Sequence, residues 1–245
     1  MRWAEPPPGV TLAENAVHVW RTSLRLPAAS IQQLRKILAP DEIQRADRFR
    51  FAQDRQHFTV ARGVLRQLLG RYLQRDPAQI QLQYNAYGKP ALAASERQPA
   101  LKFNLSHSGE LALYAFAYQR EVGIDVEWRH RRVEQAEGIA ARFFSAQECA
   151  ALRTVPAQQQ QEAFLNCWTR KEAYIKARGR GLSLPLHQFD VSLRPGEPAR
   201  LLATRDDPNQ AARWTMQALQ PGAEYIAALV VEGDAWELIC WHWTG

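Results

Sequence analysis

Cysteine is scarce in this chain: its 245 residues include three, Cys149, Cys167 and Cys240. Because they are isolated and odd in number, they argue against a disulfide framework or a zinc site and fit a reducing cytosol. Long apolar runs are lacking too: no stretch approaches the ~20 residues of a membrane helix, and residues 1–8 lack the apolar run of a signal peptide. We therefore expect a cytoplasmic protein without a membrane partner.

Acidic residues are outnumbered: 25 Asp and Glu stand against 31 Lys and Arg, which gives a net charge of +6. A basic excess is typical of proteins that bind polyanions such as nucleic acid, a phosphate-rich ligand or an acidic protein. It equally fits a surface charged for solubility. With 46% hydrophobic and 23% charged residues, the composition is that of a globular protein with a core.

Apolar periodicity predicts an α+β protein. Residues 54–74 form the clearest helix, because Phe58, Leu65, Tyr72 and other apolar residues recur at three-to-four spacing. The order of elements divides the chain into two halves, 1–120 and 121–245, each an antiparallel strand set with helices. Further helices are expected at 31–38, 133–144 and 158–178, and strands at 17–20, 80–84, 101–105, 111–118, 122–128, 189–193, 200–204, 214–219, 225–231 and 236–243.

Two acidic segments carry the strongest chemical signal. Asp125 and Glu127 lie two apart in an apolar, β-branched run, so a strand points both carboxylates the same way. Glu172 and Lys176 lie four apart in a helical pattern and share one stripe with Trp168. Two strand carboxylates, a helix carboxylate and an ammonium suit Mg²⁺ and phosphate.

Each acidic segment also has an ordinary structural interpretation. Alternating acids are common on the solvated face of an edge strand, which would account for Asp125 and Glu127. Glu172 and Lys176 fit a surface ion pair worth about 0.2–0.5 kcal/mol. Both interpretations remain open when each segment is taken singly.

Two polar motifs precede the acids. Gly88, Lys89 and Pro90 form a turn between strands, which is either a phosphate-contacting turn or an ordinary one. The strand end at 103–108 carries Asn104, Ser106, His107 and Ser108, whose side chains can donate to phosphate oxygens or bond locally to the turn. A Ser–His hydrolase is disfavoured, because no G-x-S-x-G elbow surrounds the serines.

In this order the four motifs resemble those of the Sfp-type 4′-phosphopantetheinyl transferases. That family has a GKP turn, an F-N-(I/L)-S-H-S strand end, a (V/I)-G-(I/V)-D-(I/V)-E strand and a W-(S/T)-x-K-E-(S/A)-x-x-K helix, which stand here at 88–90, 103–108, 122–127 and 168–176. The resemblance covers roughly residues 40–189. It implies a pseudo-dimer of two similar α+β halves, with the active site in the cleft between them.

The resemblance also implies the reaction. A cytoplasmic, monomeric, Mg²⁺-dependent enzyme would transfer the 4′-phosphopantetheine arm of coenzyme A to a serine of an apo acyl or peptidyl carrier protein, releasing adenosine 3′,5′-bisphosphate. Asp125, Glu127 and Glu172 would hold Mg²⁺, Glu172 could accept the serine proton, and Lys176 would stabilise the leaving phosphate. The residues expected to contact coenzyme A are Arg45, Tyr84, Tyr87, Gly88, Lys89, Pro90, Asn104, Ser106, His107 and Lys176.

One position departs from the family pattern. The resemblance implies that Arg45 contacts the 3′-phosphate of coenzyme A, and the family often has a second basic residue three positions earlier, where this chain has Glu42. Arg48, Arg55 or Arg62 could replace that charge, and the sequence does not choose among them.

A basic segment, Trp128 to Arg132, directly follows the strand acids. Because carrier proteins are usually acidic, it is either a carrier-docking patch or a solvated basic loop. If it docks the carrier, charge reversal at Arg131 and Arg132 raises the KM for the carrier and leaves the affinity for coenzyme A unchanged.

Two other functions compete with transfer. A Mg²⁺-dependent nuclease also needs spaced acids and a lysine, although its Glu-x-Lys pair usually lies on a strand with one intervening residue. A non-catalytic nucleic-acid-binding module would explain the basic charge and leave the acids without a role. We expect no nucleic-acid partner.

Overall fold

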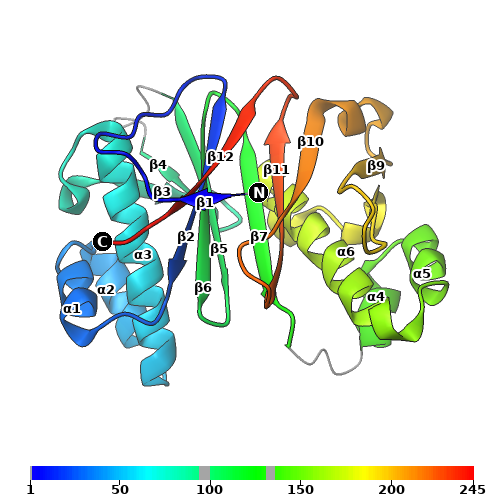
Figure 1. Ribbon diagram of the computed structural model, residues 1–245, viewed down its shortest axis with the longest axis horizontal. Helices are drawn as coiled ribbons and strands as arrows, with labels where there is room; N and C mark the ends of the chain where they lie inside the picture. Colours follow the sequence, from blue (N-terminus) through cyan, green and yellow to red (C-terminus); the bar gives the residue numbers. More distant parts are fainter. Residues whose placement is uncertain (1, 94–99, 131–135) are drawn as a thin grey trace.

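Two sheets lie next to each other in the middle of the molecule, with helices on the outer side of each (Figure 1). This computed structural model describes residues 2–93, 100–130 and 136–245. One apolar cluster lies between the sheets, and one lies between each sheet and its helices. The α+β prediction is confirmed. None of the helices in the described ranges is long and apolar enough to cross a membrane.

The first sheet has five strands in the order β1-β12-β2-β6-β5. The sequence predicts antiparallel pairing, and β12 instead runs parallel to both β1 and β2, because the chain returns from the second half to enter this sheet. The boundary at 120/121 stays a prediction. The strands are β1 (Trp3–Ala4), β12 (Glu237–His242), β2 (Ala16–Ser23), β6 (Leu111–Tyr118) and β5 (Leu101–Ser108).

The second sheet is antiparallel, in the order β10-β11-β7. Its strand β7 carries the acidic segment and lies at the sheet edge that faces β5 (Figure 1). Two hairpin-like pairs, β3–β4 and β8–β9, complete the described strands. The strands are β10 (Trp214–Leu219), β11 (Tyr225–Glu232), β7 (Val122–Trp128), β3 (Leu82–Tyr84), β4 (Pro90–Leu92), β8 (Phe189–Val191) and β9 (Leu201–Thr204).

The two long helices predicted from periodicity are confirmed as α3 (Ala52–Leu73) and α6 (Ala157–Arg178). The helix α6 ends at Gly179, which adopts a left-handed φ of 63° that favours glycine. The shorter elements are α1 (Ala28–Lys36), α2 (Pro40–Asp47), α4 (Ala136–Phe143), α5 (Ala146–Arg153), η1 (Pro77–Gln79), η3 (Gly181–Ser183), η4 (Leu186–Gln188) and η5 (Pro208–Arg213).

A buried ion pair fixes α6 against α5. Lys171 is fully buried and places its Nζ 2.7 Å from the Oε2 atom of Glu148. The same ammonium donates to the carbonyl oxygens of Leu186 and Phe189, and Glu148 closes the capping box with Ser145 at the start of α5. Lys171 therefore holds the helix in place from its core side.

The buried imidazole of His18 should make stability depend on pH. Tyr72 accepts a hydrogen bond from Trp20 at 2.7 Å, so its hydroxyl donates to Nδ1 of His18 at 2.8 Å. Burial lowers the pKa of His18 from 6.5 to about 4. Between pH 6.5 and pH 4, His18 is protonated in the unfolded chain and neutral in the folded protein. As pH falls through this range, the free energy of unfolding therefore falls by up to about 1.4 kcal/mol per pH unit.

His18→Gln should therefore flatten the decline in urea midpoint between pH 6.5 and pH 4. The exposed His242, in the neighbouring strand β12, offers the matched control, and His242→Gln should leave the slope as in the wild type. An unchanged slope in the His18 variant would show that another group governs acid unfolding.

Candidate active site

Side chains of β5 join the two sheets by hydrogen bonds to β7. The backbone N–H of Ile124 donates to the Oδ1 atom of Asn104 at 2.9 Å, and the hydroxyl of Ser106 donates to the Oδ1 atom of Asp125 at 2.8 Å. Because side chains alternate along a strand, Asn104 and Ser106 present one face of β5 to β7. The polar end of β5 therefore connects the first sheet to the second by side-chain hydrogen bonds.

The two strand acids share the face that was predicted. The hydroxyl of Ser108, two residues beyond Ser106, donates to the Oε2 atom of Glu127 at 2.9 Å. Asp125 and Glu127 are buried, with 5% and 7% of their surfaces exposed. Burial of both carboxylates against β5 excludes the solvated edge-strand interpretation, because a solvated face would leave them in water.

A glycine lets α6 approach β7 closely enough to complete the cluster. A Cβ atom on Gly123 would lie 2.1 Å from the carbonyl oxygen of Ala173 and 2.3 Å from the amide nitrogen of Ala177. This close packing brings the Nζ atom of Lys176 to 2.6 Å from the Oδ1 atom of Asp125. The helix residue Lys176 therefore contacts the strand acid Asp125, as the sequence predicts.

Glu172 lies in the electrostatic field of the strand acids. Burial raises its pKa from 4.5 to about 7, and repulsion from Asp125 and Glu127 adds to the rise while Lys176 opposes it. A carboxyl group with a pKa near neutrality can accept a proton under physiological conditions. Trp168, the first residue of the predicted stripe, instead stacks on Phe164 in the core.

The carboxylate oxygens of Asp125, Glu127 and Glu172 are chemically suited to a hard divalent cation. The Oδ2 atom of Asp125 is buried and has no hydrogen-bond partner among the described residues, and carboxylate oxygens are the ligands Mg²⁺ prefers. As arranged here, the described ranges hold no three His, Cys, Asp or Glu side chains close enough together to bind a metal ion. Lys176 supplies the positive charge next to Asp125 instead.

A basic cavity of about 300 Å³ adjoins the acid cluster. Four predicted site residues reach it, from α2, β5 and α6. The pKa of His107 is lowered by burial and by neighbouring cations, chiefly Lys176, and both effects favour the neutral ring. The lining residues are Arg45, Phe58, Ala61, Arg62, Leu105, Ser106, His107 and Lys176.

The turn between β3 and β4 is ordered by Asn85, which the sequence analysis missed. Its Oδ1 atom accepts from the backbone N–H groups of Tyr87 and Lys89, both at 2.9 Å, and Gly88 takes a left-handed φ of 81°. Its Nδ2 group donates to the carbonyl oxygen of Gly179 at 2.7 Å, which ties the turn to the end of α6. An Asn just before the turn was the available signal, because its side chain can accept from the backbone two residues further on.

The residues of this turn do not line the cavity. The ammonium of Lys89 lies 3.2 Å from the carbonyl oxygen of Val122 and 3.5 Å from the Oε2 atom of Glu121. Burial lowers the pKa of Lys89, although Glu121 opposes the change. Tyr84 is 39% exposed and has the guanidinium of Arg62 5.8 Å from its ring. Tyr87, Gly88 and Pro90 complete the turn outside the cavity.

The proposed docking segment is described in part. Arg131 and Arg132 lie outside the described residues, and Trp128 is 40% exposed. Arg129 pairs with Glu162 of α6 at 3.0 Å. The docking role of this segment stays a prediction.

Comparison with known proteins identifies the class. A family model described as 4′-phosphopantetheinyl transferase superfamily matches residues 121–230, and one described as 4′-phosphopantetheinyl transferase, N-terminal, matches residues 22–119. The chain therefore belongs to the 4′-phosphopantetheinyl transferase superfamily, and its activity is transfer of phosphopantetheine to carrier proteins. The predicted family and enzyme class are confirmed.

Individual relatives cover most of the chain. The 4′-phosphopantetheinyl transferase HetI of a Nostoc species is 40% identical over 241 residues, which is 98% of both chains. The 4′-phosphopantetheinyl transferase Sfp of Bacillus subtilis is 32% identical over 66% of this chain and 69% of its own. A solved holo-(acyl-carrier-protein) synthase from Bacillus anthracis, in complex with CoA (3′,5′-ADP), aligns over 46% of this chain and 94% of its own, at 18% identity and a TM-score of 0.37.

Proposed function

We propose that the phosphopantetheine donor is coenzyme A and that the reaction takes place between the acid cluster and the basic cavity. The observation that carries this proposal is the Lys176 ammonium, which lies 2.6 Å from Asp125 and also lines the cavity. A nucleotide in the cavity would place its pyrophosphate next to Asp125, Lys176 and Glu172. Transfer between phosphate groups depends mainly on such positioning and charge neutralisation.

The proposed chemistry balances without a further reactant. The hydroxyl oxygen of the carrier serine attacks the phosphorus that bears the pantetheine arm, and forms the new ester bond. The bond from that phosphorus to the nucleotide phosphate breaks, and adenosine 3′,5′-bisphosphate leaves. Glu172 accepts the serine proton, and Lys176 stabilises the negative charge on the departing phosphate.

We assign Mg²⁺ binding to Asp125, Glu127 and Glu172, whose side chains must come closer together than they lie here to share one ion. When bound, the ion would neutralise and polarise the pyrophosphate oxygens. The pKa of Glu172 is raised first by burial and then by repulsion from Asp125 and Glu127. That repulsion, together with the Oδ2 atom of Asp125, which has no hydrogen-bond partner among the described residues, favours uptake of a cation here. Ser106 and Ser108 orient the two strand carboxylates by donating to the Oδ1 atom of Asp125 and the Oε2 atom of Glu127.

Glu172→Gln should abolish detectable transfer, because the amide keeps the size of the side chain and can neither accept a proton nor bear a charge. The measurement is the initial rate of carrier modification, with Mg²⁺ affinity determined alongside by calorimetry. Loss of rate with retained Mg²⁺ affinity assigns Glu172 as the base, and loss of both assigns it as a ligand too. A near-normal rate would remove Glu172 from the mechanism.

One experiment tests the proposal as a whole. The protein is incubated with coenzyme A, Mg²⁺ and an apo carrier domain, and the carrier is weighed by mass spectrometry. Fatty-acid, polyketide and peptide carriers are tried in turn, and a gain of phosphopantetheine on one of them is expected. No gain on any of them would refute the proposal, and cleavage of DNA in Mg²⁺ would favour the nuclease alternative.

We further propose a cytoplasmic monomer that is composed of two similar halves, 1–120 and 121–245, with the site between them. The three cysteines are free thiols, as suits a reducing compartment. Both faces of the proposed site come from one chain, through β5 and β7, which favours a monomer. The family models divide at residues 119 and 121, in support of the two-half organisation.

A further inference from the structure

The side chain of Lys89 connects the β3–β4 turn to α6 and β7. Its ammonium donates to the carbonyl oxygen of Val122 at 3.2 Å, and to the carbonyl oxygen of Ala177 and the Oε2 atom of Glu121, both at 3.5 Å. The side chain is only 17% exposed. Because an ammonium has three N–H bonds, these three acceptors within the protein use all of them.

Two of these contacts lie where α6 packs against β7. Val122 begins β7, and Ala177 lies in the last turn of α6, where carbonyl groups lose their partners in the helix ladder. The neighbouring Gly123 lets the strand and the helix touch, since a Cβ atom on it would lie 2.3 Å from the amide nitrogen of Ala177. The Lys89 ammonium therefore bridges strand and helix next to their close contact, and its charge stabilises the C-terminal end of the helix dipole.

Asn85 adds a second contact from the same turn to the same helix end. Its Nδ2 group donates at 2.7 Å to the carbonyl oxygen of Gly179, the residue that ends α6. Its Oδ1 atom accepts from the backbone N–H of Lys89, so the residue that orders the turn also fixes the backbone of Lys89. The β3–β4 turn thus supplies two hydrogen-bond donors to the C-terminal end of α6.

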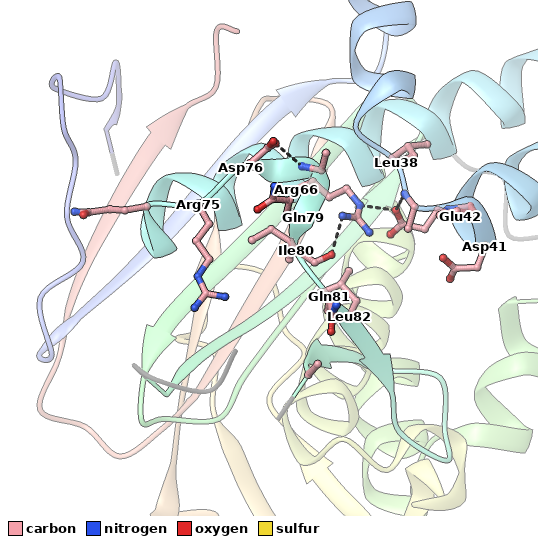
Figure 2. A pocket seen from close by; sticks show the side chains of 15 residues that line it. Leu38, Asp41, Glu42, Arg66, Arg75, Asp76, Gln79, Ile80, Gln81 and Leu82 are labelled. Atoms are coloured by element: carbon pink, nitrogen blue, oxygen red, sulfur yellow. Dashed lines mark hydrogen bonds and ion pairs between the residues drawn. The ribbon is translucent and has the colours of Figure 1, made fainter. Parts of the chain in front are cut away.

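The hairpin that carries both residues is anchored in the proposed first half of the chain. Leu92 of β4 is 3% exposed and belongs to the apolar cluster that includes residues of α3. At the start of β3, Gln81 and Leu82 instead border a cavity of about 1030 Å³ between the hairpin, η1 and α2 (Figure 2). Because β3 and β4 pair only with each other among the described strands, the position of the turn depends on Leu92 and on its contacts with α6.

We propose that Lys89 is a positioning residue for the reaction, which holds Lys176 at Asp125 by fixing the end of α6. Lys176 directly precedes Ala177, so the backbone that Lys89 contacts is the backbone that carries the Lys176 ammonium. A shift of this last turn would change the 2.6 Å contact between Lys176 and Asp125. The role rests on the proposed part of Lys176 in the reaction, and it differs from the contact with coenzyme A that the resemblance implies for Lys89.

Lys89→Gln distinguishes positioning from contact with the substrate. The rate constant kcat for carrier modification should fall roughly tenfold or more, because the helix end is released. The affinity for adenosine 3′,5′-bisphosphate, measured by calorimetry on the full chain, should stay within about twofold of the wild type. Amide hydrogen exchange, followed by mass spectrometry, should become faster in the last turn of α6.

Lys102→Gln is the matched control. The Lys102 side chain is 44% exposed and pairs with the same acid as Lys89, Glu121, but within the described ranges no hydrogen bond or ion pair joins its ammonium to α6. This variant loses the same charge and should keep the kcat, the nucleotide affinity and the hydrogen exchange of the wild type.

Two results would overturn the proposal. A fall in nucleotide affinity as large as the fall in kcat would mean that Lys89 contacts the substrate, and an unchanged kcat or unchanged exchange would mean that Lys89 does not position α6. If Lys89→Gln does not fold, Asn85→Asp decides in its place. Its carboxylate can still accept from the N–H groups of the turn and cannot donate to Gly179, so it should also speed exchange at the end of α6 and lower kcat.

Hydrogen exchange needs no turnover, so the two proposals fail separately. A wild type that does not transfer phosphopantetheine refutes the proposed function, and the exchange of α6 in Lys89→Gln still tests whether Lys89 holds the helix end. Normal transfer by the wild type together with unchanged exchange in the variant refutes the role of Lys89 alone.

Discussion

Asp125→Asn is expected to lower the transfer rate by at least about a hundredfold. Asp125 links α6 and β5 at the site, because its Oδ1 atom accepts hydrogen bonds from both Lys176 and Ser106. Its buried Oδ2 atom is left for a ligand. Asparagine keeps the shape of the side chain and removes the negative charge that we assign to the metal and to the orientation of Lys176.

The substitution should leave the fold intact. The amide oxygen of asparagine can still accept from Lys176 and Ser106, so the seam between β5 and β7 retains its hydrogen bonds. A loss of transfer with an unchanged urea midpoint therefore assigns the effect to the charge.

The rate is followed as phosphopantetheine gained by the carrier, measured by mass spectrometry. Glu232→Gln is the matched control, because Glu232 lies on the neighbouring strand β11 and pairs with Arg213 away from the cluster. It should keep the wild-type rate. A rate within a few fold of wild type in Asp125→Asn would remove Asp125 from the mechanism.

The local parts of the site could be predicted from sequence. A period of two places Asp125 and Glu127 on one strand face, and a period of 3.6 places Glu172 and Lys176 on one helix stripe. These directions depend on residues near each other in the chain. The structure confirms both and adds that Asp125 and Glu127 are buried.

The contacts of other polar side chains could not be predicted, because their partners lie far away in the sequence. The sequence left open whether Lys89 lies in a phosphate-contacting or an ordinary turn, and it did not predict that the ammonium donates to the carbonyl oxygen of Val122 at the start of β7, 33 residues along the chain. Ser108 was expected to bond to a phosphate or to the local turn, and its hydroxyl donates to Glu127 on the neighbouring sheet. A strand pattern likewise predicts that residues near 236–243 alternate, and it does not say that β12 enters the sheet of the first half in parallel.

The choice among Arg48, Arg55 and Arg62 shows the same limit. All three are arginines near Arg45 in sequence, and the spacing favours none of them. In the structure Arg62, unlike Arg48 and Arg55, lines the basic cavity, and its Nε atom lies 3.5 Å from Glu42. Both features depend on how α2 packs on α3.

Gly123→Ala is expected to destabilise the protein by about 3 kcal/mol or more. The added methyl group would lie 2.1 Å from the carbonyl oxygen of Ala173 and 2.3 Å from the amide nitrogen of Ala177. Both contacts are with backbone atoms of α6, so no side-chain rotation relieves them. The helix must move away from β7, which also draws Lys176 from Asp125 and should reduce transfer.

Urea unfolding gives the stability, and the transfer assay is run on the folded fraction. Gly222→Ala is the matched control, because the nearest atom to its added Cβ is a ring carbon of Tyr225 at 3.6 Å, an ordinary contact. It should change stability by less than about 1 kcal/mol. Wild-type stability in Gly123→Ala would mean that α6 and β7 tolerate a wider spacing. The contact between Lys176 and Asp125 would then not depend on the close packing of β7 against α6.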